Sequence, residues 1–252
     1  LWLLPWQGNQ AASFAVFRIP SNPFLPLPKA QRSPAHLRWV WLYASCAVVL
    51  SLLAFGLQAA WYGLLWPALA LLWLATVYGH ADAAAWQKQA TGKHTLAVSL
   101  FAWPLRLMYR ANMAYWLRGK ALSAQVTERF HVGSVLAAPN FHAVVDVCAE
   151  YPLAVMPSYY ATIPMLDMVP ADVATLRAAA DALHQMLQQQ NQPVLVCCAL
   201  GYSRSVAVVL VYLLRQGHAH DLQAALKLLQ QARPDMVASP VNQQQILKAA
   251  HE

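Results

Sequence analysis

The sequence of 252 residues is poor in charged side chains, and this excludes several classes of protein. Only 11% of its residues are Asp, Glu, Lys or Arg, while 59% are hydrophobic. Soluble domains average about 25% charged residues. A chain this apolar is not disordered, collagen-like or a nucleic-acid-binding tail, and its composition argues against an enzyme that is soluble throughout.

Cysteine is also scarce. The four cysteines, Cys46, Cys148, Cys197 and Cys198, are too few and too unevenly spaced for a disulfide framework. No two pairs of them have the spacing of a structural zinc site, and the nine His share no metal-binding spacing. We therefore expect a reducing compartment, no metal and no cofactor.

Acidic residues are nearly absent from the first half of the chain. Residues 1–120 hold ten Lys and Arg but one acid, Asp82, and all ten Trp lie at or before Trp116. Residues 121–252 hold seven Lys and Arg and nine acids. Positive charges interleaved with aromatic residues and Leu are typical of membrane surfaces, so we expect membrane lipids, and no nucleic acid, as partners.

One long uncharged run is present, from Trp39 to Gly79, with 41 residues that include no Asp, Glu, Lys, Arg or His. As a single helix it would measure about 60 Å, twice the roughly 30 Å of a bilayer core. We predict two membrane spans instead, Trp39–Leu57 and Trp61–Gly79, joined by a tight turn. The alternative, a buried helical hairpin, is disfavoured because soluble cores rarely need so long an uncharged run.

A two-span hairpin places both of its flanks on the same side of the membrane. Both flanks are rich in Lys and Arg, and the positive-inside rule then places them in the cytoplasm with everything downstream. We expect a multi-pass protein whose second half is cytoplasmic. The abundance of Ala, Leu and Gln suggests a bacterial inner membrane.

Two basic segments flank the hairpin. Residues 1–38 form a Pro-rich lead-in or the tail of a missing membrane domain. Residues 80–120 form a basic aromatic segment, in which 95–119 is either a third span or a helix lying in the interface. We favour the interfacial helix, because an odd number of spans would export the downstream thiols. Pro104 should kink or break it.

From residue 121 the pattern changes to short apolar strands and amphipathic helices. We expect strands at 125–132, 143–148, 159–164 and 193–197, and helices at 173–190, 205–216 and 221–232. Strands alternating with helices indicate an α/β fold with helices on both faces of a central sheet. Residues 121–252 are therefore predicted to form an α/β domain that follows a transmembrane hairpin at 39–79.

The junction after the fourth predicted strand carries the clearest chemical signal. Cys198 ends a buried strand, and Arg204, six residues later, begins a helix. The loop N–H groups and the helix N-terminus can together bind an anion, and Gly201 gives the loop its conformational freedom. Arg204 can hold two oxygens of a tetrahedral oxyanion, and Cys198 lies where a thiolate is stabilised.

Cys198-(x5)-Arg204-Ser205 resembles the signature loop of the protein tyrosine and dual-specificity phosphatases. The segment Ile163–Met168 looks like the family's general-acid segment, and Ala143–Glu150 like its early core strand. The resemblance covers about residues 121–250. It implies a cysteine-dependent phosphatase that hydrolyses phosphomonoesters.

The resemblance also implies a role for each site residue. Cys198 is the nucleophile that forms a phosphocysteine, Arg204 binds the equatorial oxygens, Asp167 is the general acid, and Ser205 donates a hydrogen bond to the thiolate. The phosphate-binding loop comprises Ala199, Leu200, Gly201, Tyr202, Ser203 and Arg204.

Two positions qualify these assignments. Asp172 is a rival acid, although it also suits the N-cap of the helix that begins at Val173. Cys197 stands where the family usually has His, and a neutral thiol is a weak substitute for an imidazole.

The substrate stays open between a phospholipid headgroup and a phosphoprotein. The loop has no basic residue between Cys198 and Arg204, which argues against highly phosphorylated inositol lipids, whereas the membrane anchor favours a lipid. Two other readings are kept. One is a pseudophosphatase that binds phosphate groups at the membrane without turnover, and the other is a structural membrane protein with an accidental motif.

Overall fold

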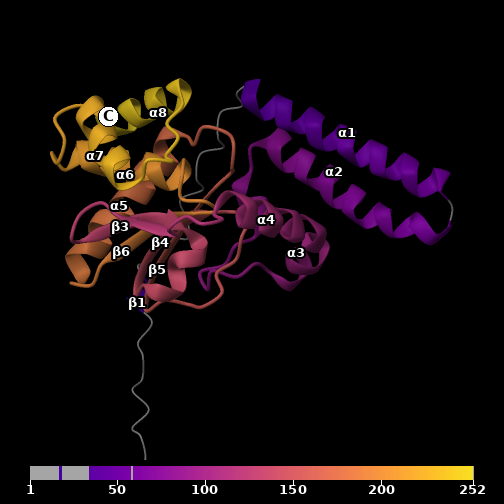
Figure 1. Ribbon diagram of the computed structural model, residues 1–252, viewed down its shortest axis with the longest axis horizontal. Helices are drawn as coiled ribbons and strands as arrows, with labels where there is room; N and C mark the ends of the chain where they lie inside the picture. The colour runs from indigo at the N-terminus through magenta and orange to yellow at the C-terminus, as the bar shows by residue number, and fades with distance from the viewer. Residues whose placement is uncertain (1–16, 19–33, 58, 252) are drawn as a thin grey trace, which may run out of the picture.

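The computed structural model describes residues 17–18, 34–57 and 59–251. A helical N-terminal part and an α/β part lie beside each other in Figure 1. Most of the expected lead-in, residues 1–38, lies outside the described residues.

Two apolar helices form a hairpin that projects from the rest of the molecule (Figure 1). They are α1 (Pro34–Gly56) and α2 (Leu65–His80), joined through the 3₁₀ helix η1 (Ala59–Leu64). The two expected helices are confirmed, although the second starts with a 3₁₀ segment and the first begins five residues earlier than predicted. Pro34 suits that start because its fixed φ fits the first turn of a helix and its missing N–H has no partner there.

Both helices have the length and composition to cross a membrane, with 23 residues in Pro34–Gly56 and 20 in Trp61–His80. At 1.5 Å per residue, α1 measures about 35 Å, enough for a bilayer core. Large apolar side chains point outward along it: Trp41 is 71% exposed, Leu52 67% and Phe55 65%. Such a face is typical of contact with lipid or with another apolar surface.

The connecting segment forms four short elements. They are the 3₁₀ helix η2 (Ala83–Trp86), a turn closed by a bridge between Lys88 and His94, and the helices α3 (Leu96–Phe101) and α4 (Trp103–Trp116). The expected break at Pro104 is confirmed, because α3 and α4 meet at Ala102 and Pro104 lies in the first turn of α4.

The junction of α3 and α4 packs against α2. The indole N–H of Trp66 donates to the carbonyl of Phe101 over 3.0 Å, and the Trp66 ring stacks on Trp103 at 5.7 Å. The α3–α4 pair therefore lies along the side of the apolar hairpin.

Six strands form the sheet, in the order β1-β5-β4-β6-β3-β2. They are β1 (Phe17–Arg18), β2 (Ser123–Gln125), β3 (Phe130–Ser134), β4 (Ala143–Cys148), β5 (Tyr159–Met165) and β6 (Val194–Cys198). All neighbours are parallel except the β2–β3 pair. The central strands β4 and β6 are buried on both faces, as their continuous apolar runs predicted.

The single strand predicted at 125–132 is wrong. The Thr127 hydroxyl accepts hydrogen bonds from the N–H groups of Arg129 (3.2 Å) and Phe130 (3.3 Å), which turns the chain between β2 and β3. This turn contains no Gly, Pro or Asn, so the run from 125 to 132 looks continuous in the sequence.

Helices cover both faces of the sheet, as expected. One face packs against α5 (Val173–Gln189), α6 (Arg204–Arg215), α7 (Leu222–Ala232) and α8 (Pro240–His251). The other is covered by the 3₁₀ helix η3 (Val135–Asn140), which the sequence pattern did not reveal, and by Met113 and Leu117 at the end of α4. The N-terminal part thus completes the core of the α/β part.

Candidate active site

The turn from β6 into α6 places the expected nucleophile at the carboxyl edge of the sheet. Along β6, Val196 and Cys198 face the helices α5 and α6, whereas Leu195 and Cys197 face η3 and α4. Cys198 is 3% exposed at the end of this strand. Residues 199–203 form the loop, and Arg204 begins α6.

The Cys198 sulfur lies beside a loop N–H group, a hydroxyl group and the start of α6. The backbone N–H of Gly201 donates to Sγ over 3.2 Å, and the Ser205 hydroxyl lies 3.4 Å from Sγ. The N-terminus of α6, with its positive dipole end, begins at the same loop.

Gly201 is required at its position for two reasons. Its φ of +77° lies in the left-handed region, and a Cβ there would come within 2.6 Å of the Cα of Gly133 in β3. The loop therefore lies directly against the neighbouring strand, with one glycine on each side.

The outer side of the loop is braced by polar contacts. The Ser134 hydroxyl donates to the carbonyl of Ala199 over 2.5 Å, and the Arg233 guanidinium donates to the carbonyl of Leu200 over 3.0 Å. The Tyr202 hydroxyl donates to the carbonyl of Trp116 over 3.3 Å. Contacts from three separate segments thus fix the curvature of the loop.

Arg204 is buried and lies between two carboxylates. It donates to Glu150 through both terminal nitrogens (2.8 and 2.5 Å) and to the carbonyl of Met165 (2.9 Å). Its Nη2 also lies 3.2 Å from Oδ1 of Asp167. Its Nε is buried and has no hydrogen-bond partner among the described residues. This N–H is a donor that a bound oxyanion can satisfy.

Glu150 is the site residue that the sequence analysis missed. It is 2% exposed, and it follows β4, the strand beside β6. Burial raises the pKa of its carboxyl, but the charge and hydrogen bonds of Arg204 outweigh burial and lower the pKa overall. The available signal was an acid directly after a buried parallel strand, in a chain with only ten acids.

Asp167 lies just after β5, with its side chain 26% exposed. Burial raises the pKa of its carboxyl, the nearby charge of Arg204 opposes this, and the charge of Glu150 adds to it, so the pKa is raised. Its backbone carbonyl accepts a hydrogen bond from the hydroxyl of Tyr78 in α2 over 3.0 Å. The carboxyl therefore faces Arg204, while its backbone is tied to the apolar hairpin.

Asp172 is the N-cap of α5. Its carboxylate accepts hydrogen bonds from the backbone N–H (2.9 Å) and the hydroxyl (2.6 Å) of Thr175. Both of its oxygens are thus used by the helix, which makes Asp167 the better candidate for the acid.

Cys197 points away from the loop's phosphate-binding side. Burial raises the pKa of its thiol well above the usual value, and the same holds for Cys148 on the adjacent strand β4. Both thiols stay protonated near neutral pH, so neither competes with Cys198 as a nucleophile.

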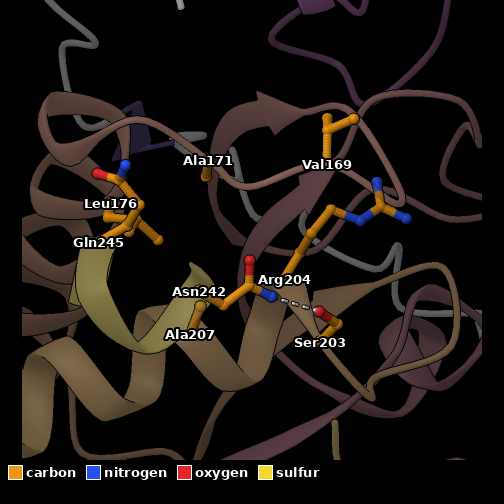
Figure 2. Close-up of a pocket in the computed structure, with 8 residues that line it drawn as sticks. All are labelled: Val169, Ala171, Leu176, Ser203, Arg204, Ala207, Asn242 and Gln245. Carbon is orange, nitrogen blue, oxygen red and sulfur yellow. Dashed lines mark hydrogen bonds between the residues drawn. The ribbon is translucent and has the colours of Figure 1, made fainter. Parts of the chain in front are cut away.

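A pocket opens beside Arg204, between α5, α6 and α8. Figure 2 shows its lining, in which the Asn242 amide donates to the Ser203 hydroxyl over 3.3 Å. The lining residues are Val169, Ala171, Leu176, Ser203, Arg204, Ala207, Asn242 and Gln245. Arg204 is the one charged member of this set. Within the described part of the chain, no cluster of three or more His, Cys, Asp or Glu could hold a metal ion.

Comparisons with known proteins agree with this geometry. The sequence profile of the dual specificity phosphatase catalytic domain matches residues 126–252, just over half of the chain. No curated protein matches the chain in sequence.

Several solved phosphatase structures are similar to the α/β part. Tk-PTP in its active form is 20% identical over 51% of this chain and 95% of its own, with a TM-score of 0.44. Human DUSP28 is 23% identical over 52% and 93%, with a TM-score of 0.45. PTPMT1 in complex with PI(5)P is 14% identical over 52% and 95%, with a TM-score of 0.43.

Proposed function

Since the chain belongs to the dual specificity phosphatase family, we propose that it is a membrane-anchored phosphatase that hydrolyses phosphomonoesters through a phosphocysteine intermediate. The observation that carries this proposal is the Cys198 sulfur beside a loop N–H, a hydroxyl and a helix N-terminus, next to a buried arginine with an unpartnered N–H.

In the first step, the Cys198 thiolate attacks phosphorus. The S–P bond forms and the bond from phosphorus to the leaving oxygen breaks. Asp167 gives its proton to that oxygen, so the alcohol leaves neutral. Arg204 and the N–H groups of residues 199–204 bind the equatorial oxygens, where negative charge is spread in the transition state.

In the second step, a water molecule attacks the phosphocysteine. Asp167, now a carboxylate, accepts the proton of the water, the S–P bond breaks, and inorganic phosphate is released. Ser205 donates a hydrogen bond to the departing thiolate, consistent with its 3.4 Å distance from the sulfur. Each group returns to its starting protonation state.

We propose that the substrate is a phospholipid headgroup or a phosphoprotein at the membrane, and the geometry favours the lipid. The acid segment is tied to the apolar hairpin through Tyr78, so the site lies close to the end of that hairpin. Met168, beside the acid, is apolar and 61% exposed.

The two apolar helices, with residues 39–79 as the spanning hairpin, support a multi-pass membrane location. The basic flanks of the hairpin support a cytoplasmic position for the catalytic domain at 121–252, and the composition supports a bacterial inner membrane. The basic aromatic segment at 80–120 then lies at the membrane surface.

A second candidate is a pseudophosphatase that binds phosphate groups at the membrane without turnover. The observation that favours it is Cys197 in place of the usual His, since a buried neutral thiol cannot replace an imidazole. The complete set of Cys198, Arg204 and Asp167 favours turnover instead.

The test is phosphate release from a small aryl phosphate by the full chain in lipid vesicles, under reducing conditions. We expect Cys198→Ser to abolish release, because a hydroxyl at this position is not ionised at neutral pH. Cys197→Ala is the matched control, since it alters the adjacent thiol on the other face of the sheet, and we expect it to retain most of the activity.

An inactive but folded wild-type chain would contradict the enzyme. Binding of tungstate, a phosphate-like oxyanion, by that inactive chain but not by Arg204→Ala would support the pseudophosphatase. Equal activity in wild type and Cys198→Ser would instead exclude the phosphocysteine.

A further inference from the structure

Lys88, in the segment that connects the hairpin to α3, is buried against the catalytic sheet. Its ammonium donates to Oδ2 of Asp146 (2.6 Å), to the carbonyl of Cys148 (2.6 Å) and to the carbonyl of Tyr151 (2.7 Å). Neither the Lys88 nor the Asp146 side chain has any exposed surface. All three donor positions of the ammonium are therefore used.

The rest of the Lys88–His94 turn holds the same loop. Nε2 of His94 lies 2.8 Å from the carbonyl of Ala149, and the N–H of Leu153 donates to the carbonyl of Gly92 over 2.8 Å. Five polar contacts thus join the turn to residues 146–153, which are the end of β4 and the loop after it. The contacts come from residues more than fifty positions earlier in the chain.

Glu150 lies within the loop that is held. Lys88 binds the carbonyls on either side of it, at Cys148 and Tyr151, and His94 contacts the residue immediately before it. The Glu150 carboxylate in turn holds both terminal nitrogens of Arg204. A continuous series of contacts therefore leads from Lys88 to the arginine of the phosphate loop.

We propose that Lys88 is a positioning residue for phosphate binding, which fixes the loop at 148–151 so that Glu150 orients Arg204. The proposal rests on the proposed phosphatase function. It places a required residue outside the 126–252 region that matches the family, in the part of the chain that connects to the membrane hairpin.

Stability alone does not account for this arrangement. Moving an ammonium and a carboxylate out of water costs several kcal/mol per ion, and apolar residues of similar volume often serve stability equally well. A lysine, unlike an apolar residue, holds three acceptors of the segment 146–151 at fixed distances from one ammonium group. The contacts to the carbonyls of Cys148 and Tyr151 fix the backbone on both sides of Glu150, and this fixes the direction of the Glu150 side chain.

The test separates positioning from stability by removing both charges together. In the full chain, Lys88→Met leaves the Asp146 carboxylate buried and unpaired, so this variant should be unstable. The double variant Lys88→Met/Asp146→Asn removes both charges of this pair together and should recover most of the thermal stability. It still lacks the two bonds to the carbonyls of Cys148 and Tyr151. Lys93→Met is the control, since Lys93 is an exposed lysine of the same turn.

The readout is the inhibition constant of inorganic phosphate, together with kcat and KM for an aryl phosphate. Because small misplacements of binding groups are costly, we expect phosphate to bind about tenfold more weakly to the double variant than to wild type, with Lys93→Met unchanged. A double variant with wild-type stability and wild-type phosphate affinity would overturn the proposal.

A second variant covers the case in which the double variant does not fold. His94→Ala removes one contact to the loop without leaving a charge unpaired, and it should also weaken phosphate binding. Wild-type affinity in this variant would then count against the proposal. An inactive wild-type chain would refute the phosphatase itself, whereas an active wild type with unaltered variants would refute only the role of Lys88.

Discussion

Two carboxyl groups beside Arg204 have opposite pKa shifts. Burial raises the pKa of both, but the Glu150 carboxylate makes two hydrogen bonds to the arginine, which lower its pKa overall. Asp167 makes one longer contact of 3.2 Å, and its pKa stays raised. Arg204 thus favours the charged form of Glu150, while Asp167 keeps its proton to a higher pH than an ordinary Asp, a division of roles that suits acid catalysis.

If Asp167 is the general acid, as proposed, its raised pKa should set the pH dependence of turnover. An acid with a raised pKa keeps its proton to a higher pH than an ordinary Asp, so kcat should fall as pH rises through that pKa. Asp167→Asn should lower kcat by about 10²–10⁴-fold and remove this basic limb, as measured in a pH–rate profile with an aryl phosphate.

Asp172→Asn is the matched control, because an amide oxygen can still cap α5. We expect a wild-type pH profile and a loss of stability of at most about 1 kcal/mol. If the basic limb disappeared in Asp172→Asn and persisted in Asp167→Asn, the acid would be Asp172.

At the scale of elements, the phosphate loop depends on its contact with β3. Gly201→Ala places a methyl group against the backbone of Gly133 and also strains a φ of +77°. We expect loss of phosphate binding and a lower melting temperature, measured by thermal unfolding with and without tungstate.

Gly217→Ala separates the two causes. Gly217 has a similar φ of +70° at the end of α6, but a Cβ there meets nothing within 4 Å. This variant should lose only the roughly 1–2 kcal/mol that the left-handed conformation costs other residues, with tungstate binding intact. Equal losses of binding in the two variants would mean that the contact with β3 is unimportant.

The elements that were predictable from sequence are those with strong local patterns. β4 has the predicted bounds, because a run of six residues in which only Asp146 is polar indicates a central strand. The helix predicted at 221–232 is α7, which Asp221 caps through the N–H of Ala224. The β2–β3 turn was missed because a Thr hydroxyl forms it without the usual turn residues.

The site was only partly predictable, for a physical reason. Cys198, Arg204 and Ser205 are close in sequence, so their spacing alone places them together. Glu150 and Lys88 act through contacts to residues 54 to 63 positions away, and no local pattern encodes such contacts. The contact between the Lys88–His94 turn and the loop after β4 can therefore be seen in the folded structure but not in the sequence.

At the scale of the whole molecule, the N-terminal part contacts three separate segments of the active site. Tyr78 binds the acid segment, the Lys88 turn binds the loop of Glu150, and the carbonyl of Trp116 accepts from Tyr202 in the phosphate loop. Helix α4 also covers one face of the sheet. The helical part therefore supports the candidate active site, in addition to its proposed role as a membrane anchor.

Tyr78→Phe tests this support. The variant keeps the ring beside Trp39 and Tyr43 but leaves the carbonyl of Asp167 without its donor. We expect a several-fold lower kcat with unchanged phosphate affinity, because the acid is displaced and Arg204 is not. Tyr62→Phe, at the exposed far end of the hairpin, is the control. A fall in phosphate affinity with unchanged kcat would contradict the assignment.

The hydrogen bond between Tyr78 and Asp167 would make the proposed membrane-anchored enzyme sensitive to the thickness of its membrane. Hydrophobic helices tilt when their apolar length exceeds the thickness of the bilayer. Because the acid segment is bonded near the end of α2, we expect a change in tilt to displace Asp167, the proposed proton donor. The catalytic rate should then depend on the acyl-chain length of the surrounding lipids, so that bilayer thickness becomes a variable in the turnover of this enzyme.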